Sequence, residues 1–108
     1  MRVCNKVRGM ISLAAKAGRV VSGESAVRAA AQKGQAALLL ADKNASANTM
    51  DRMGRLATAY ALPLLYVEEL GASIGRTGRT MVAVCDAGFA KAIAGKYDEC
   101  EHGGVVVE

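Results

Sequence analysis

Apolar side chains recur at three- and four-residue steps near the start of the chain, which is the spacing of one helix face. This pattern predicts a first helix over residues 3–17, and Gly18 supplies a natural stop for it. A short strand follows over residues 19–22, and Ser22 is expected to cap a second helix over residues 23–33. The apolar positions of the two helices are Val3, Val7, Met10, Ile11, Ala14 and Ala17, then Ala26, Val27, Ala30 and Ala31.

The middle of the chain alternates between an apolar run and a helical pattern. The continuous apolar run at 36–41 predicts a strand that is covered on both faces. The polar segment 42–45 is expected to be a loop, so the aspartate in it is interpreted as a loop residue. Ser46 or Asn48 then opens a third helix that extends to about Tyr60.

A proline ends that helix, and the last third of the chain repeats the alternation. Residues 64–67 form an apolar strand, and residues 68–74 form a short helix with acidic side chains at its favourable N-terminal end. A basic, glycine-containing loop at 75–78 leads into a strand over residues 80–85. Asp86 is expected to cap the final helix.

Strands that alternate with helices predict an α/β protein, here a three-layer α/β/α sandwich with a small, mostly parallel mixed sheet. The length of 108 residues fits one domain. We expect this domain to span residues 1–96, with an acidic C-terminal tail over residues 97–108. Aromatic residues make up only 4% of the chain, so four rings (Tyr60, Tyr66, Phe89 and Tyr97), mostly buried, cannot form a broad platform for stacking bases.

Charge is distributed unevenly along the chain, although the net value is only +4. Residues 1–33 carry seven basic side chains against one acidic side chain, whereas residues 97–108 carry four acidic side chains and no lysine or arginine. A basic face of this kind fits a polyanionic partner. Ordinary solvated surface charge is the alternative interpretation.

Signatures of catalysis and of metal binding are sparse. The sequence has neither a G-x-x-x-x-G-K-[ST] phosphate loop nor a G-x-G-x-x-G motif after a strand, and its single histidine, His102, falls in the acidic tail. Three cysteines without C-x-x-C spacing are typical of free thiols in a reducing compartment. We therefore expect a non-catalytic protein without cofactor or metal. A cytoplasmic location follows, because the sequence has no secretory signal and no apolar stretch long enough to span a membrane.

Basic side chains surround the predicted start of the second helix. A helix N-terminus attracts anions through its unpaired N–H groups and the positive end of its dipole. Glycines let a backbone approach phosphate closely, and loops at one end of an α/β sheet converge. The residues expected to form one binding groove are Lys16, Arg19, Gly23, Glu24, Ser25 and Arg28, together with Gly75, Arg76, Thr77, Arg79 and Thr80 of the second loop.

Three blocks of sequence resemble the kink-turn-binding ribosomal-protein superfamily (L-seven-Ae / L-thirty-e type), and most of all its small bacterial YlxQ-like branch. They are A-G-R-V-V-S-G-E at 17–24, A-S-A-N-T at 45–49 and E-L-G-A-S-I-G-R at 69–76. The resemblance implies an α/β/α sandwich that docks a helix N-terminus into the widened major groove of a sharply bent RNA. In the G-x-N-E-x-x-K pattern of kink-turn binders, this chain has Ser25, Ala26 and Ala29 at the Asn, Glu and Lys positions.

These observations favour a monomeric, non-catalytic RNA-binding protein whose partner is a structured RNA, with a kink turn as the first candidate and the ribosome as its setting. Bent RNA can also be bound through its shape and its phosphates. A protein–protein adaptor on the same fold is the alternative, because the altered motif fits a loss of RNA specificity. An accessory substrate-binding subunit of an RNA-modifying enzyme is a third hypothesis.

Overall fold

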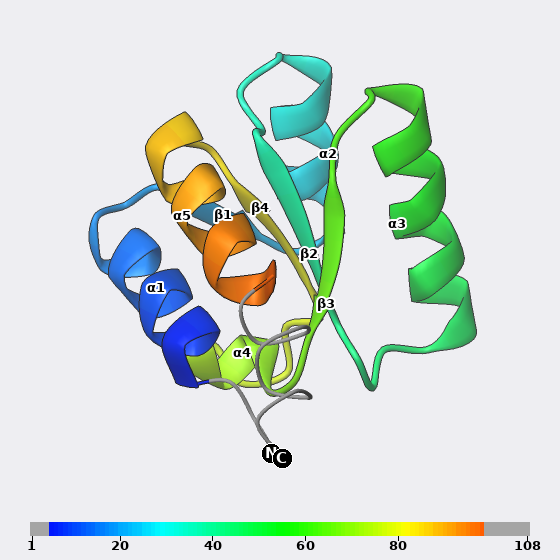
Figure 1. The fold of residues 1–108 in the computed structure, drawn as a ribbon. Coiled ribbons are helices and arrows are strands. Elements are labelled where there is room, and N and C mark those ends of the chain that lie inside the picture. The colour runs from blue at the N-terminus through cyan, green and yellow to red at the C-terminus, as the bar shows by residue number, and fades with distance from the viewer. Residues whose placement is uncertain (1–4, 99–108) are drawn as a thin grey trace.

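The computed structural model describes residues 5–98, so Val3, Cys4, Cys100, His102 and most of the predicted acidic tail lie outside the described residues. Helices and strands alternate as the sequence predicts (Figure 1). The elements are α1 (Asn5–Lys16), β1 (Val20–Ser22), α2 (Glu24–Gln32), β2 (Leu38–Asp42), α3 (Ala47–Ala59), β3 (Leu64–Val67), α4 (Leu70–Ser73), β4 (Met81–Val84) and α5 (Ala87–Asp98).

The four strands form one mixed sheet in the order β1-β4-β2-β3. Only β2 and β3 pair in parallel, whereas β4 is antiparallel to both β1 and β2. The predicted mixed sheet is confirmed, but two of its three strand pairings are antiparallel, so it is not mostly parallel. The reason is that α4 and the loop after it begin and finish at the same end of the sheet (Figure 1), so β4 runs back in the opposite direction.

Helices cover both faces of the sheet, which confirms the three-layer α/β/α architecture. In Figure 1, α1, α4 and α5 lie on one side of the strands, and α2 and α3 lie on the other. Side chains of a strand alternate between the two faces. Accordingly, Leu38 and Leu40 of β2 pack in one apolar cluster with α1 and α5, and Leu39 packs in a second cluster with Val27 and Met53.

Two of the three predicted caps are confirmed. The Ser46 side chain accepts a hydrogen bond from the backbone N–H of Thr49 at 3.1 Å, and the Asp86 carboxylate accepts one from the N–H of Phe89 at 2.9 Å. Ser22 is not a cap, because the chain is still paired in β1 at that position. The residue that precedes α2 is Gly23, and it provides no side-chain cap.

Two of the four aromatic rings are more exposed than expected. Tyr60 follows the last turn of α3 and is 41% exposed, and Tyr66 of the edge strand β3 is 38% exposed. Phe89 and Tyr97 pack against the cluster beneath α1 and α5.

Candidate functional site

The start of α2 and the loop at 75–80 lie side by side at one end of the sheet, as the sequence predicts. Ser22 pairs with Val82 across the β1–β4 ladder. One residue further along, the N–H of Gly23 donates to the carbonyl of Met81 at 3.0 Å. This bond joins two segments that are far apart in sequence into one surface.

Gly23 makes room for the loop that lies against it. Its φ of 93° lies in the region that favours glycine, and a Cβ at this position would overlap Nη1 of Arg79. The guanidinium of Arg79 therefore lies directly over the turn that leads into α2. Because no side chain caps this helix, the N–H groups of Glu24 and Ser25 in its first turn are able to donate to a ligand.

The loop at 75–80 is folded tightly against α4. The N–H of Arg76 donates to the carbonyl of Gly71 at 2.8 Å, and the N–H of Arg79 donates to the carbonyl of Arg76 at 3.1 Å. A Cβ on Gly71 would lie only 2.6 Å from the carbonyl oxygen of Arg76. A glycine at this position thus sets how closely the arginine-bearing loop approaches α4.

Asp42 joins the same end of the sheet to α4, a role that was not predicted from the sequence. It is the last residue of β2 rather than a loop residue, and only 9% of it is exposed. Its carboxylate accepts hydrogen bonds from the N–H of Leu70 at 3.0 Å and from the N–H of Asn44 at 2.8 Å. The signal in the sequence is an aspartate placed directly after a fully apolar strand.

Glu24 gathers two arginines beside the start of α2. Its carboxylate pairs with Nη2 of Arg28 at 2.6 Å, within the helix, and with Nη1 of Arg52 at 2.7 Å, from α3. Arg52 was not among the predicted site residues, because nothing in the local sequence indicates that α3 packs beside α2. A hollow of about 290 Å³ on the outer side of α2 is lined by Glu24, Ser25, Arg28, Ala29 and Gln32.

Two predicted site residues lie elsewhere. The carbonyl of Arg19 accepts a hydrogen bond from the N–H of Cys85 at 2.7 Å, at the opposite end of the β1–β4 ladder from Gly23. Lys16 ends α1 at that same far end. The expectation that both surround the groove is therefore wrong, because β1 lies between them and the site. The other predicted residues in the loop (Gly75, Arg76, Thr77, Arg79 and Thr80) and at the start of α2 do come together.

The described part of the chain offers little for other chemistry. Within residues 5–98, His, Cys, Asp and Glu side chains do not gather into a group of three that could hold a metal ion. No helix in this range is long and apolar enough to cross a membrane. Cys85 is half-buried, and burial raises the pKa of its thiol, so it is a poor nucleophile at neutral pH.

Comparison with known proteins gives the family. Over 92 residues the chain is 37% identical to the RNA-binding protein YlxQ of Bacillus subtilis (strain 168), and the match covers 82% of this chain and 92% of that protein. The chain belongs to the YlxQ family. The branch that the three sequence blocks indicated is thereby confirmed, although no family model matches the chain.

Solved structures agree with the YlxQ-family assignment. A protein of unknown function from Bacillus halodurans C is 32% identical and superposes with a TM-score of 0.82, over 87% of this chain and 98% of that one. The 15.5kD RNA binding protein of Giardia lamblia superposes with a TM-score of 0.70, over 90% of this chain and 86% of that one, at only 10% identity. The second likeness shows that the fold is shared.

Proposed function

We propose that this YlxQ-family protein binds structured RNA without catalysing a reaction, and that a kink turn, such as those of ribosomal RNA, is its preferred target. The observation that carries the proposal is the uncapped start of α2 with the guanidinium of Arg79 lying over it. The name of the Bacillus subtilis relative supports RNA as the ligand.

The first turn of α2 is the part of the site that faces the RNA. Backbone N–H groups of Glu24 and Ser25, aided by the helix dipole, donate to a phosphate or to the edge of a base. Ser25 adds a hydroxyl that donates or accepts. Ala26 and Ala29 offer no polar side chain, so the α2 surface contributes close approach and shape rather than a bidentate base contact.

The loop at 75–80 covers the neighbouring part of the bend. Arg76 and Arg79 are exposed there, and each neutralises backbone phosphate. Arg28 adds a third cation on the next turn of α2, held by Glu24. The charges come from two segments that the Gly23–Met81 hydrogen bond fixes relative to each other, which suits a ligand of defined shape.

A pair of RNAs tests the proposal. One is a stem that contains a kink turn, and the other is the same stem with its tandem G·A pairs replaced by Watson–Crick pairs, each titrated at two salt concentrations. We expect tight binding to the first RNA and a clear loss with the second. Equal, strongly salt-dependent binding to both would reject shape recognition, and no binding to either would favour the adaptor hypothesis.

Charge removal at the loop tests the site itself. The double variant Arg76→Ala, Arg79→Ala should weaken binding and lower its salt dependence, because each lost phosphate contact reduces the slope of log K against log salt by about 1. The double variant Lys16→Ala, Arg19→Ala is the matched control, since it removes the same charge at the opposite end of the sheet. An equal effect of both variants would overturn the assignment of the loop.

A further inference from the structure

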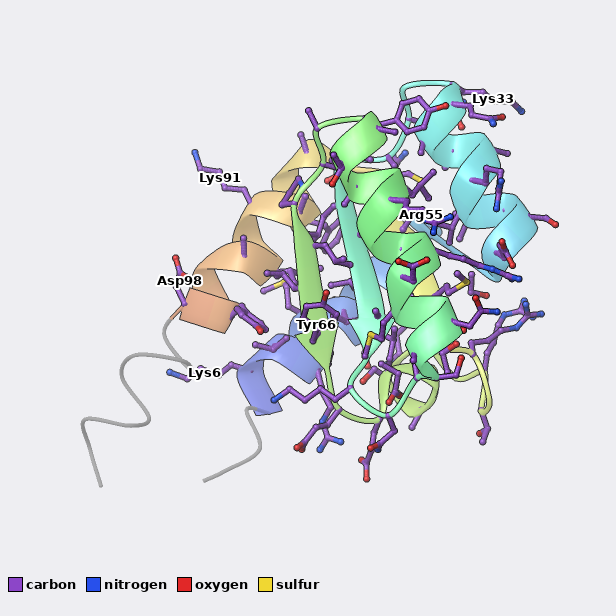
Figure 2. The ribbon with its side chains drawn as sticks, turned by 90° about the vertical axis from the view of Figure 1, so that its right-hand side faces the viewer. Lys6, Lys33, Arg55, Tyr66, Lys91 and Asp98 are labelled. Carbon is purple, nitrogen blue, oxygen red and sulfur yellow. The ribbon has the colours of Figure 1, made fainter. Side chains whose placement is uncertain are left out.

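A groove of about 400 Å³ runs between α2 and α3, on the face of the sheet opposite α1 and α5. Figure 2 looks onto these two helices, with Arg55 labelled on α3. Buried Val27 and Met53 lie in its floor together with Met81. The groove is therefore apolar at its base.

Arginines surround this apolar floor. Arg28, Arg52 and Arg55 all line the groove, and Glu24 is the one acidic residue among its lining residues. Glu24 bonds to Arg28 and to Arg52, so a single carboxylate holds one guanidinium from each helix at the groove. Arg55 pairs with Asp51, one turn earlier on α3, at 2.9 Å. Each guanidinium carries five N–H donors, and these exposed pairs are weak in water, so a phosphate is able to compete for them.

The groove begins where the proposed RNA site ends. Glu24 and Arg28 belong to the first two turns of α2 and also line the groove. From Glu24 to Gln32 the groove follows α2 for about 12 Å, which corresponds to roughly three stacked nucleotides. At its far end lies Tyr60, whose ring is exposed enough to stack with a base.

We infer that the α2–α3 groove binds a single-stranded segment of RNA that continues from the structured site. The phosphates contact Arg28, Arg52 and Arg55, and an unpaired base lies on the apolar floor beside Tyr60. This inference rests on the proposed RNA binding and adds a second, unpaired part to the ligand. The arginines fit a polyanion, and continuity with the start of α2 favours RNA over an acidic peptide as that polyanion.

Titration of the ¹⁵N-labelled full chain with a five-nucleotide oligouridylate tests the groove independently of the bent stem. We expect resonance shifts at Arg52, Leu56 and Tyr60. The double variant Arg52→Ala, Arg55→Ala should weaken oligouridylate binding by at least about fivefold, because two phosphate contacts are lost. Tyr60→Leu should also weaken binding, whereas Tyr60→Phe, which keeps the ring, should retain it.

A blunt kink-turn stem and the same stem with a five-nucleotide single-stranded extension separate this inference from the proposed function. The extension should tighten binding to the wild-type protein and have no effect on the Arg52→Ala, Arg55→Ala variant. If the blunt stem does not bind but oligouridylate still occupies the groove, the kink-turn proposal fails and the groove stands. Two outcomes would overturn the assignment of the groove to single-stranded RNA. One is that resonance shifts are confined to residues 23–25 and 75–80, and the other is that an acidic peptide binds the groove whereas oligouridylate does not.

Discussion

Substitution of Gly71 by alanine tests how the arginine-bearing loop is held against α4. Gly71 is buried in α4, and its φ is not in the region reserved for glycine, so an alanine backbone fits without strain. The added Cβ would nevertheless lie 2.6 Å from the carbonyl oxygen of Arg76 and 3.1 Å from both the nitrogen and the oxygen of Arg79. All three neighbours are backbone atoms, so the loop itself must move.

The expected cost follows from two opposing terms. Alanine is favoured over glycine within a helix by about 0.5–1 kcal/mol. Forcing an extra carbon into a packed site costs about 1–3 kcal/mol, and here the movement also disturbs the hydrogen bond from the N–H of Arg76 to the carbonyl of Gly71. The middle of the steric range, about 2 kcal/mol, exceeds the middle of the helix range, about 0.8 kcal/mol, so we expect a net loss of about 1 kcal/mol in the free energy of unfolding.

Thermal and urea unfolding measure this loss. A cost of 1 kcal/mol corresponds to a fall in Tm of roughly 4–8 °C for a domain of this size. Gly95→Ala is the matched control, because Gly95 lies in α5 with no atom within 4 Å of a Cβ, and it should be neutral or stabilising. RNA affinity should fall in the Gly71→Ala variant and stay unchanged in the Gly95→Ala variant. A variant as stable as the wild type, with unchanged RNA binding, would refute the close approach of the loop.

Three further predictions concern side chains outside the loop. Asp42→Ala leaves two backbone N–H groups without their acceptor and should lower the free energy of unfolding by about 1–3 kcal/mol, measured by urea titration; an unchanged midpoint would contradict this. Ser46→Ala removes the cap of α3 and should cost about 1 kcal/mol in the same assay, whereas Ser46→Asp should restore the loss. Burial raises the pKa of the Cys85 thiol in the folded protein above that of the unfolded chain. The neutral thiol therefore contributes fully to stability below the pKa of the unfolded thiol, and this contribution is lost as the pH rises through the higher pKa of the folded protein. In a Cys4→Ser, Cys100→Ser background, Cys85 should therefore react with iodoacetamide more slowly in the native protein than in urea at pH 8, and equal rates would contradict its burial.

Elements with a strong local signal could be predicted from the sequence. The strand at 64–67 has the predicted bounds, and Ser46 and Asp86 cap their helices, because each signal depends on neighbours within a few residues. Strand direction could not be predicted in the same way. Whether β4 runs parallel or antiparallel to β2 depends on which end of the sheet α4 occupies, and no short pattern encodes that position.

The candidate site could likewise be predicted where the signal is local and not where it depends on distant contacts. The proximity of Gly23 to the basic loop was predicted from two local patterns, because Gly23 directly follows one strand and the loop directly precedes another. Arg19 was expected beside them because it is close in sequence, but a strand of three residues is enough to carry it to the far end of the sheet. Two features of the site could not be predicted because they depend on contacts between residues 28 positions apart. Glu24 bonds to Arg52, and the buried Asp42 bonds to Leu70.

Four separate stretches of the chain meet at the end of the sheet that bears the site. The Gly23–Met81 bond, the Asp42–Leu70 bond and the approach of Arg76 to Gly71 join them only when the whole domain is folded. A ligand that binds this surface therefore binds the native state and not the unfolded chain. Such a ligand at 100 times its Kd raises the free energy of unfolding by about 2.7 kcal/mol. RNA should consequently raise the Tm of the entire domain and slow amide hydrogen exchange in strands that never contact it.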